Sequence, residues 1–342
     1  MKKWVVLFCI LFVLAGFAMV YDSRTPSVYI APQKEIVNKE VSQPSTPILF
    51  VGDIMLGRYV ELLTNTSGDE LYSFRNVEDY LKQHVTIANL EGPIPDSHTP
   101  TPANGFTFSF PSSTPRILKE GGIAAVSLAN NHMFDKGSNG YSQTKRALDT
   151  GGVPHFGGYT PTESNYFETK LGEKQVIVYG VTMIATGWDE AQALEVTKNL
   201  RVSHPQAHLI AFLHWGNEYV TQNTYQRAFA HSLIDNGVDT VIGGHPHVVQ
   251  GVELYNNKPI FYSLGNFIFD QWWRNDLEDG VMIRLSEDKN NYVYEIIPIR
   301  QAKAVPSIAT STVRDNILSN MSKQSDVSLK EAILRGSFSI PK

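Results

Sequence analysis

Six short runs place a residue that can hold a metal at the end of a predicted strand. They are Gly52-Asp53, Asn89-Leu90-Glu91, Asn130-Asn131-His132, His214-Trp215-Gly216, Gly244-His245-Pro246-His247 and Leu264-Gly265-Asn266. In an open α/β sheet, a catalytic cleft lies at the carboxyl ends of the strands. The sequence therefore predicts a metal-binding cleft at that edge of a sheet.

The residue types in these runs suit a metal-dependent hydrolase. Carboxylate, amide and imidazole groups form the mixed oxygen and nitrogen set that binds Zn, Mn or Fe. His245 and His247 alternate across Pro246, so both imidazoles lie on one face of an extended chain. The predicted ligands of one or two divalent ions are Asp53, Glu91, Asn131, His214, His245 and His247.

Taken singly, several of these residues have plainer explanations. Asp53 could cap a helix or turn, His214 could be a hydrogen-bonded core residue, and Asn131 with His132 could belong to a turn. As a set they match two-metal phosphoesterases, which hold two cations about 3.5–4 Å apart and clamp a phosphate. His132 could then act as a general acid. Arg58 suits an anionic substrate, with a surface salt bridge as the alternative, and Asn266 is a second candidate for substrate binding.

Strand-like and helix-like segments alternate around these runs. Predicted strands cover residues 48–51, 85–88, 123–128, 175–181, 208–213 and 239–242, followed by 252–255, 259–264, 280–285 and 292–299. Predicted helices cover residues 70–82, 114–120, 141–150, 190–200 and 225–236, with a short one within 326–335. Alternating β and α followed by a run of β predicts an α/β sheet packed on a second, mixed sheet.

The chain opens with an apolar segment. Lys2-Lys3 precede Trp4 to Tyr21, which hold no charge and as a helix would measure roughly 27 Å, close to the ~30 Å bilayer core. The lysines favour a cytoplasmic N-terminus and an exported body; a cleaved signal peptide is the alternative. We therefore predict a single-pass cell-membrane anchor over residues 1–21, a Pro-rich extracytoplasmic linker over 22–46, a domain over 47–300 and a C-terminal extension over 301–342.

Composition narrows the possible partners. The formal net charge is -5, which argues against nucleic acid as a partner. The single cysteine, Cys9, lies in the apolar leader, so no disulfide framework is expected in the body.

Five motifs resemble those of a known family. They are Val51-Gly52-Asp53-Ile54-Met55-Leu56-Gly57-Arg58, Leu128-Ala129-Asn130-Asn131-His132, His214-Trp215-Gly216-Asn217-Glu218-Tyr219, Gly244-His245-Pro246-His247-Val248 and Tyr262-Ser263-Leu264-Gly265-Asn266-Phe267-Ile268-Phe269-Asp270-Gln271. In this order they resemble the capsule-synthesis CapA family, also called the poly-gamma-glutamate capsule biosynthesis family. That family is similar to calcineurin-like metallophosphoesterases.

The resemblance implies a four-layer α/β/β/α sandwich in which the six predicted ligands take metal positions. It places His132 beside the bridging asparagine, where it would stabilise a phosphoryl transition state. Three residues depart from the phosphoesterase pattern: Met55 stands where it has a histidine, Glu91 where it prefers aspartate, and Asn130 where it has glycine. Loss of the histidine implies a single metal or a weak second site.

Three functions follow. The resemblance implies a membrane-anchored component of capsule or poly-gamma-glutamate production or export, with a cytoplasmic ligase and a small multi-span membrane protein as partners. The first alternative is a cell-surface metal-dependent hydrolase of phosphoesters or amides without a capsule. The second is a binding or scaffold domain that has lost catalysis.

Overall fold

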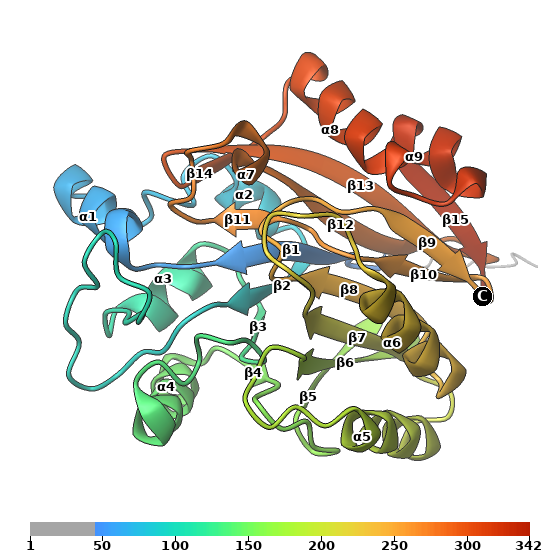
Figure 1. Cartoon of the computed structure of the whole chain (residues 1–342), viewed down its shortest axis with the longest axis horizontal. Coiled ribbons are helices and arrows are strands. Elements are labelled where there is room, and N and C mark those ends of the chain that lie inside the picture. The colour runs from blue at the N-terminus through green and yellow to red at the C-terminus, as the bar shows by residue number, and fades with distance from the viewer. Residues whose placement is uncertain (1–44) are drawn as a thin grey trace, which may run out of the picture. The chain divides into compact units, whose positions relative to one another are not determined.

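The structure, a computed structural model, describes residues 45–342, whose strands form two sheets (Figure 1). The first sheet has the order β14-β13-β12-β1-β2-β3-β4, with β11 paired to β1 and β15 to β13; the second has the order β5-β6-β7-β8-β10-β9.

Strands of the first sheet are β1 (Ile48–Ile54), β2 (Val85–Leu90), β3 (Ala125–Ser127), β4 (His155–Phe156), β11 (Asn266–Ile268), β12 (Asp279–Glu287), β13 (Asn291–Ala302), β14 (Val305–Ile308) and β15 (Ser337–Pro341). Those of the second are β5 (Tyr166–Leu171), β6 (Lys174–Thr182), β7 (His208–His214), β8 (Thr240–Gly244), β9 (Val252–Tyr255) and β10 (Lys258–Phe261).

Both sheets combine parallel and antiparallel strands. β1 to β4 run parallel in the first sheet, and β12 joins β1 antiparallel. In the second sheet β6, β7, β8 and β10 run parallel, whereas β5 and β9 are antiparallel. The sequence predicted only one mixed sheet. The difference arises because the later strands return to both sheets, β9 and β10 to one and β11 to β15 to the other.

Three hydrophobic clusters hold the layers together. Side chains alternate along a strand, so Phe50 of β1 faces Phe212 of β7 between the sheets, whereas Leu49 faces the helices. The outer face of the first sheet packs on α3 (Thr114–Glu120) and α4 (Gly137–Gly151), and that of the second packs on α5 (Glu190–Ser203) and α6 (Thr224–Asp235). The predicted α/β sandwich of two sheets is confirmed.

Local chemistry explains where helices differ from expectation. The predicted helix over 114–120 has the bounds of α3, but the one over 70–82 is reduced to α2 (Glu78–Leu81). An unpredicted helix, α1 (Arg58–Ser67), ends instead at Gly68, whose φ of 70° is left-handed. Asp69 Oδ1 then accepts a hydrogen bond from the Leu71 amide at 2.9 Å, which stabilises a turn.

Residues 301–342 contain more ordered elements than the one short helix that the sequence predicted within 326–335. They include α8 (Ser311–Lys323), a 3₁₀ turn over Val327–Leu329 and α9 (Lys330–Arg335), and β15 pairs with β13. Leu318 and Met321 of α8 and Ile333 of α9 are buried in the cluster that also lines the space between the sheets. A short helix, α7 (Asn275–Glu278), precedes β12.

Among residues 45–342, no helix combines the length and apolar character needed to cross a bilayer. The predicted anchor over residues 1–21, and the predicted linker up to residue 44, lie outside the described residues.

Glycines permit the close backbone contacts that assemble the site edge. A Cβ on Gly52 would lie 1.9 Å from the Gly265 carbonyl oxygen, and one on Gly243 would lie 2.1 Å from the Tyr262 carbonyl oxygen. The first contact lets β11 pair with β1, with Asp53 opposite Asn266. Residues far apart in sequence thereby meet at one edge of the sheet.

A buried histidine far from that edge predicts how stability depends on pH. Burial lowers the pKa of His208 to about 4, and its Nε2 lies 3.0 Å from Thr240 Oγ1. The unfolded chain binds this proton near pH 6.5, so the contribution of His208 to stability is present above that pH and is lost as pH falls toward 4. We expect denaturant unfolding to show the parent losing on the order of 3 kcal/mol more than His208→Gln between pH 6.5 and 4. Equal losses in the two proteins would contradict a buried, neutral imidazole.

Candidate metal centre

The predicted ligands meet where parallel strands of both sheets end. Asp53 lies near the end of β1 and Glu91 follows β2, while His214 ends β7 and His245 and His247 follow β8. The second sheet is joined to the first here, because the His245 amide donates to Asp53 Oδ2 at 3.1 Å. The structure therefore brings the predicted ligands together at the carboxyl ends of strands, and it draws them from both sheets, whereas the sequence predicted the edge of one sheet.

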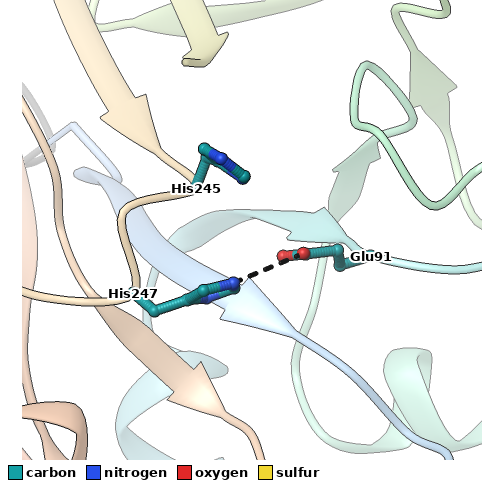
Figure 2. A group of neighbouring side chains, drawn as sticks. All are labelled: Glu91, His245 and His247. Atoms are coloured by element: carbon teal, nitrogen blue, oxygen red, sulfur yellow. Dashed lines mark ion pairs between the residues drawn. The ribbon is translucent and has the colours of Figure 1, made fainter. Parts of the chain in front are cut away.

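Glu91 lies at the centre of this cluster. Its Oε1 is 3.8 Å from His247 Nε2, 3.9 Å from His214 Nε2 and 4.0 Å from His132 Nε2. These distances are too long for hydrogen bonds, and the buried Oε1 has no hydrogen-bond partner among the described residues. Two groups of ligand atoms share this carboxylate, one with His245 and His247 (Figure 2) and one with Asp53 and His214, each with its atoms within 4.8 Å of one another.

His247 is held in a form that can bind a cation. His247 Nδ1 lies 3.0 Å from Asn266 Oδ1 and can donate to it, which leaves the Nε2 lone pair facing Glu91. A side-chain oxygen that fixes the tautomer in this way is a usual partner of a metal-binding histidine. Asn266, a predicted substrate-binding residue, is itself buried and donates to Gln271 Oε1 at 3.1 Å, so it positions His247.

Asn131 and Asn89 flank His214 on its two sides. Asn131 Oδ1 lies 2.7 Å from His214 Nε2, and Asn89 Nδ2 lies 3.3 Å from His214 Nδ1. Both contacts are satisfied when Nε2 carries the ring proton. Asn89 Nδ2 also donates to Asp53 Oδ1 at 2.8 Å, so this amide connects two of the predicted ligands.

Burial controls the charge of the cluster. It lowers the pKa of His245 to about 4 and the pKa values of His214 and His247 well below their usual value, so all three rings are neutral at pH 7. Burial raises the pKa of Asp53 to about 6, and burial with the nearby Asp53 raises the pKa of Glu91 further. Ionising two buried acids is costly, and a divalent cation bound between them and the neutral imidazoles would offset that cost.

His132 is oriented by an aspartate that the sequence did not single out. Its Nδ1 lies 2.8 Å from Asp135 Oδ2, and its ring stacks on Phe108 with centroids 4.0 Å apart. Because Asp135 accepts from Nδ1, Nε2 is the nitrogen that faces Glu91. Asp135 also accepts from the Phe108 amide at 2.6 Å, which joins the loop that carries Phe108 to this histidine.

Arg58, the other predicted substrate-binding residue, lies at the start of α1 and pairs with Asp270. Its guanidinium lies over the rings of Phe108 at 4.8 Å and Phe269 at 5.6 Å, and its buried Nε has no partner among the described residues. Part of its donor capacity is therefore already used within the protein.

The backbone around the ligands is strained. His245 has a φ of 90° and His247 a φ of 59°, in the left-handed region that few residues with a side chain adopt. Such strain costs on the order of 1–3 kcal/mol for each residue and persists where surrounding contacts impose it. The contact from the His245 amide to Asp53 is one of those contacts.

Met55 lies in the core at the position that departs from the phosphoesterase pattern. It is fully buried in the cluster on the helix-covered side of the first sheet, and its Sδ accepts from the Gly57 amide at 3.1 Å. The chain therefore offers no imidazole at this position.

Four further residues of the centre were outside the predicted set: Asn89, Phe108, Asp135 and Tyr219. Asn89 stood within one of the six runs, but Glu91 was taken as the metal-binding residue of that run. Asp135 follows His132 by three residues, a spacing that could have been recognised as an orienting pair. Phe108 carries no local signal, because its contact depends on how a distant loop folds. Tyr219 ends one of the five motifs, and its ring centroid lies 6.1 Å from that of His247, a contact that the motif alone does not predict.

The fold and the cluster define a two-sheet α/β protein with a buried carboxylate–imidazole centre at its strand ends. Residues 47–271 match the sequence profile of the family described as bacterial capsule synthesis protein PGA_cap. The chain belongs to this family, as its motifs predicted.

Two Bacillus relatives extend the similarity over most of the chain, and a third relative covers less than half of it. The capsule biosynthesis protein CapA of Bacillus anthracis is 29% identical over 87% of this chain and 76% of its own length. The PGA biosynthesis protein CapA of Bacillus subtilis (strain 168) is 30% identical over 82% of this chain and 79% of its own length. A probable polyglutamine synthesis accessory protein of Mycobacterium tuberculosis is 30% identical over 42% of this chain and 44% of its own length.

Proposed function

We propose that this protein takes part in making or exporting a capsule polymer such as poly-gamma-glutamate, through a metal-dependent centre. The names of the two Bacillus relatives support the biological role. The surroundings of Glu91 Oε1 support the metal. This buried carboxylate oxygen has three imidazole nitrogens at 3.8–4.0 Å and no hydrogen-bond partner within residues 45–342.

The residues present fit a divalent cation of the Mn, Zn or Fe kind. Two carboxylates and three neutral imidazoles offer the appropriate donors. A second orphaned atom, the buried Nδ1 of His245, adds to the unpartnered Glu91 oxygen. Asp53, Glu91 and His214 would hold one ion, and Glu91, His245 and His247 would hold it or a second one. Because Met55 offers no imidazole, we propose that the second position is the weaker.

A bound cation would supply a Lewis acid and a more acidic water. The chain's own residues supply the rest of a hydrolytic centre. His132, oriented by Asp135, presents Nε2 toward Glu91, where it can give a proton to a leaving group. Arg58 places a positive charge near the same cleft, stacked on Phe108. We propose a phosphoester or amide as the bond that is cleaved, in a centre like those of metallophosphoesterases.

Metal analysis tests the centre. Purified full-length protein should retain Mn, Zn or Fe after dialysis, and Asp53→Ala and His245→Ala should each retain far less. His155→Ala serves as the control, because His155 is a partly buried histidine of β4 that pairs with Asp149 and belongs to neither group of ligand atoms. If the two site variants held as much metal as the parent, the proposed centre would be wrong.

We propose further that the body works outside the cell, held by the apolar segment over residues 4–21. A cytoplasmic ligase and a small multi-span membrane protein are the proposed partners. The full-length protein should fractionate with membranes, and protease added to intact spheroplasts should digest it. Full protection in intact spheroplasts, with digestion after lysis, would refute the outward orientation.

A binding or scaffold role without catalysis is the second candidate, favoured by Met55 at a ligand position. It predicts that the protein binds metal yet hydrolyses neither a phosphodiester nor a gamma-glutamyl amide in the presence of Mn²⁺ or Zn²⁺. Hydrolysis that the Asp53→Ala variant lacks would exclude this candidate.

A further inference from the structure

A pocket of about 340 Å³ opens beside the metal centre. One wall is formed by Val248 and Val249, which directly follow His247, and by Tyr219, whose ring centroid lies 6.1 Å from that of His247. The opposite wall is α8, through Ile317, Asn320 and Lys323. The pocket therefore joins the strand-end loop that carries His247 to a helix that lies beyond the matched residues 47–271.

The α8 wall is fixed in place by backbone contacts. Gln324, at the C-terminal end of α8, accepts through its carbonyl oxygen from Gln222 Nε2 at 2.6 Å. A Cβ on Gly251 would lie 2.2 Å from the same oxygen, so only glycine allows this approach. The Val252 amide then donates to Ser325 Oγ at 2.7 Å. The pocket is thus held open between two hydrogen-bonded segments.

The lining combines aliphatic and neutral polar side chains. Val220, Val248, Val249 and Ile317 supply the aliphatic surface, and Thr221, Asn320 and Gln324 supply neutral donors and acceptors. Tyr219 is the only aromatic residue in the lining. Aliphatic surface edged by amides matches a chain of methylene and amide groups better than the stacked sugar rings of a polysaccharide.

Charge in the lining favours an acidic ligand. Asp276 is paired with Arg274 Nε at 2.8 Å and Asp279 with Arg300 Nε at 2.8 Å, so both carboxylates are neutralised by neighbours. Lys323 is exposed, and its ammonium makes a single polar contact within residues 45–342, to Asn320 Oδ1 at 3.4 Å. The ammonium is therefore available to pair with a carboxylate.

We propose that this pocket binds a segment of an acidic, amide-linked chain and presents the adjoining bond to the metal centre. Methylene groups of the chain would lie on the valines, amides would bond to Asn320 and Gln324, and a side carboxylate would pair with Lys323. This proposal rests on the proposed role in polymer production and assigns the substrate subsite of the same centre.

Binding of a fluorescent oligo-γ-glutamate to the purified full-length protein tests the pocket. Lys323→Ala should weaken binding about fivefold, and Lys323→Glu should weaken it more because the charge is reversed. Asn320→Trp should block the pocket sterically, since Asn320 is exposed on α8 and its replacement leaves the core intact. Raising the ionic strength should reduce binding to the parent more than to Lys323→Ala.

Lys198→Glu is the matched control, because Lys198 is an exposed lysine on α5, which covers the other sheet. It should bind as the parent does. Parent-like binding by Lys323→Glu and Asn320→Trp, or an equal loss in Lys198→Glu, would overturn the pocket. Metal content, measured on the same samples, keeps the two proposals apart. If the pocket variants hold the normal amount of metal and bind the oligomer as the parent does, only the pocket is refuted. If the parent holds no metal but its binding still depends on Lys323, only the metal centre is refuted.

Discussion

Replacing Glu91 by glutamine should abolish metal binding and leave the protein folded. Glu91 belongs to both groups of ligand atoms, so its loss removes a donor from each. We expect metal affinity to fall at least about 100-fold, beyond the effect of removing an outer-shell partner. The measurement is metal content after dialysis, together with titration of the metal-free protein with Mn²⁺ and Zn²⁺.

The same substitution should not destabilise the metal-free protein at neutral pH. Burial and the neighbouring Asp53 raise the pKa of Glu91 well above its usual value. A carboxyl group whose pKa is raised on folding contributes stability at low pH that is lost as pH rises through the folded pKa. Glutamine has nearly the same shape without this charge, so the metal-free variant should melt no lower than the metal-free parent.

Added metal should make the parent more stable than Glu91→Gln. At about 100 times its dissociation constant, a metal that binds only the folded state stabilises the parent by about 2.7 kcal/mol. Glu91→Gln should gain almost none of this. Glu195→Gln, an exposed glutamate on α5, is the control and should respond as the parent does. If Glu91→Gln bound metal as tightly as the parent, Glu91 would not be a ligand of the proposed centre.

Replacing His132 by glutamine should remove catalysis and spare metal binding. His132 Nε2 lies 4.0 Å from Glu91 Oε1, on the rim of the ligand groups and outside both. A general acid typically contributes 10²–10⁴-fold to the rate. We therefore expect metal-dependent hydrolysis of a phosphodiester to fall by about that factor in kcat, with metal content unchanged.

Asp135→Asn should lower kcat less than His132→Gln does, by about 10- to 100-fold. The substitution disturbs the orientation of His132 but leaves the imidazole in place. Its pH–rate profile should differ from that of the parent, an effect that a purely structural role would not produce. The controls are His155→Gln and Asp149→Asn, which disrupt a surface His–Asp pair with an Nε2 to Oδ1 distance of 3.1 Å. Parent-like turnover by His132→Gln would show that the histidine does not act in the reaction.

Apolar runs made the sheets predictable. β1, β7 and β8 are buried along their whole length and read in the sequence as continuous hydrophobic segments. Asp53 lies near the end of β1, His214 ends β7 and His245 follows β8. This shared position at strand ends is why these residues could be assigned to one edge. The division of strands between two sheets was harder to predict, because long-range pairings such as β1 with β12 leave no local pattern.

The residues that position the ligands could not be predicted either, because their contacts also join distant parts of the sequence. Asn266 contacts His247 from 19 residues away, and Phe108 reaches His132 from a separate loop. Asn266 was assigned to substrate binding, whereas the structure buries it behind a ligand. α8 was missed because its apolar residues, such as Leu318 and Met321, are spaced among many polar ones.

The direction of β1 has a spatial consequence. The chain enters this strand at Ile48 and reaches the centre at Asp53, so five residue steps, roughly 17 Å, separate the point of entry from the cleft. The residues that directly precede Ile48 therefore join the domain at the end of β1 opposite the cleft.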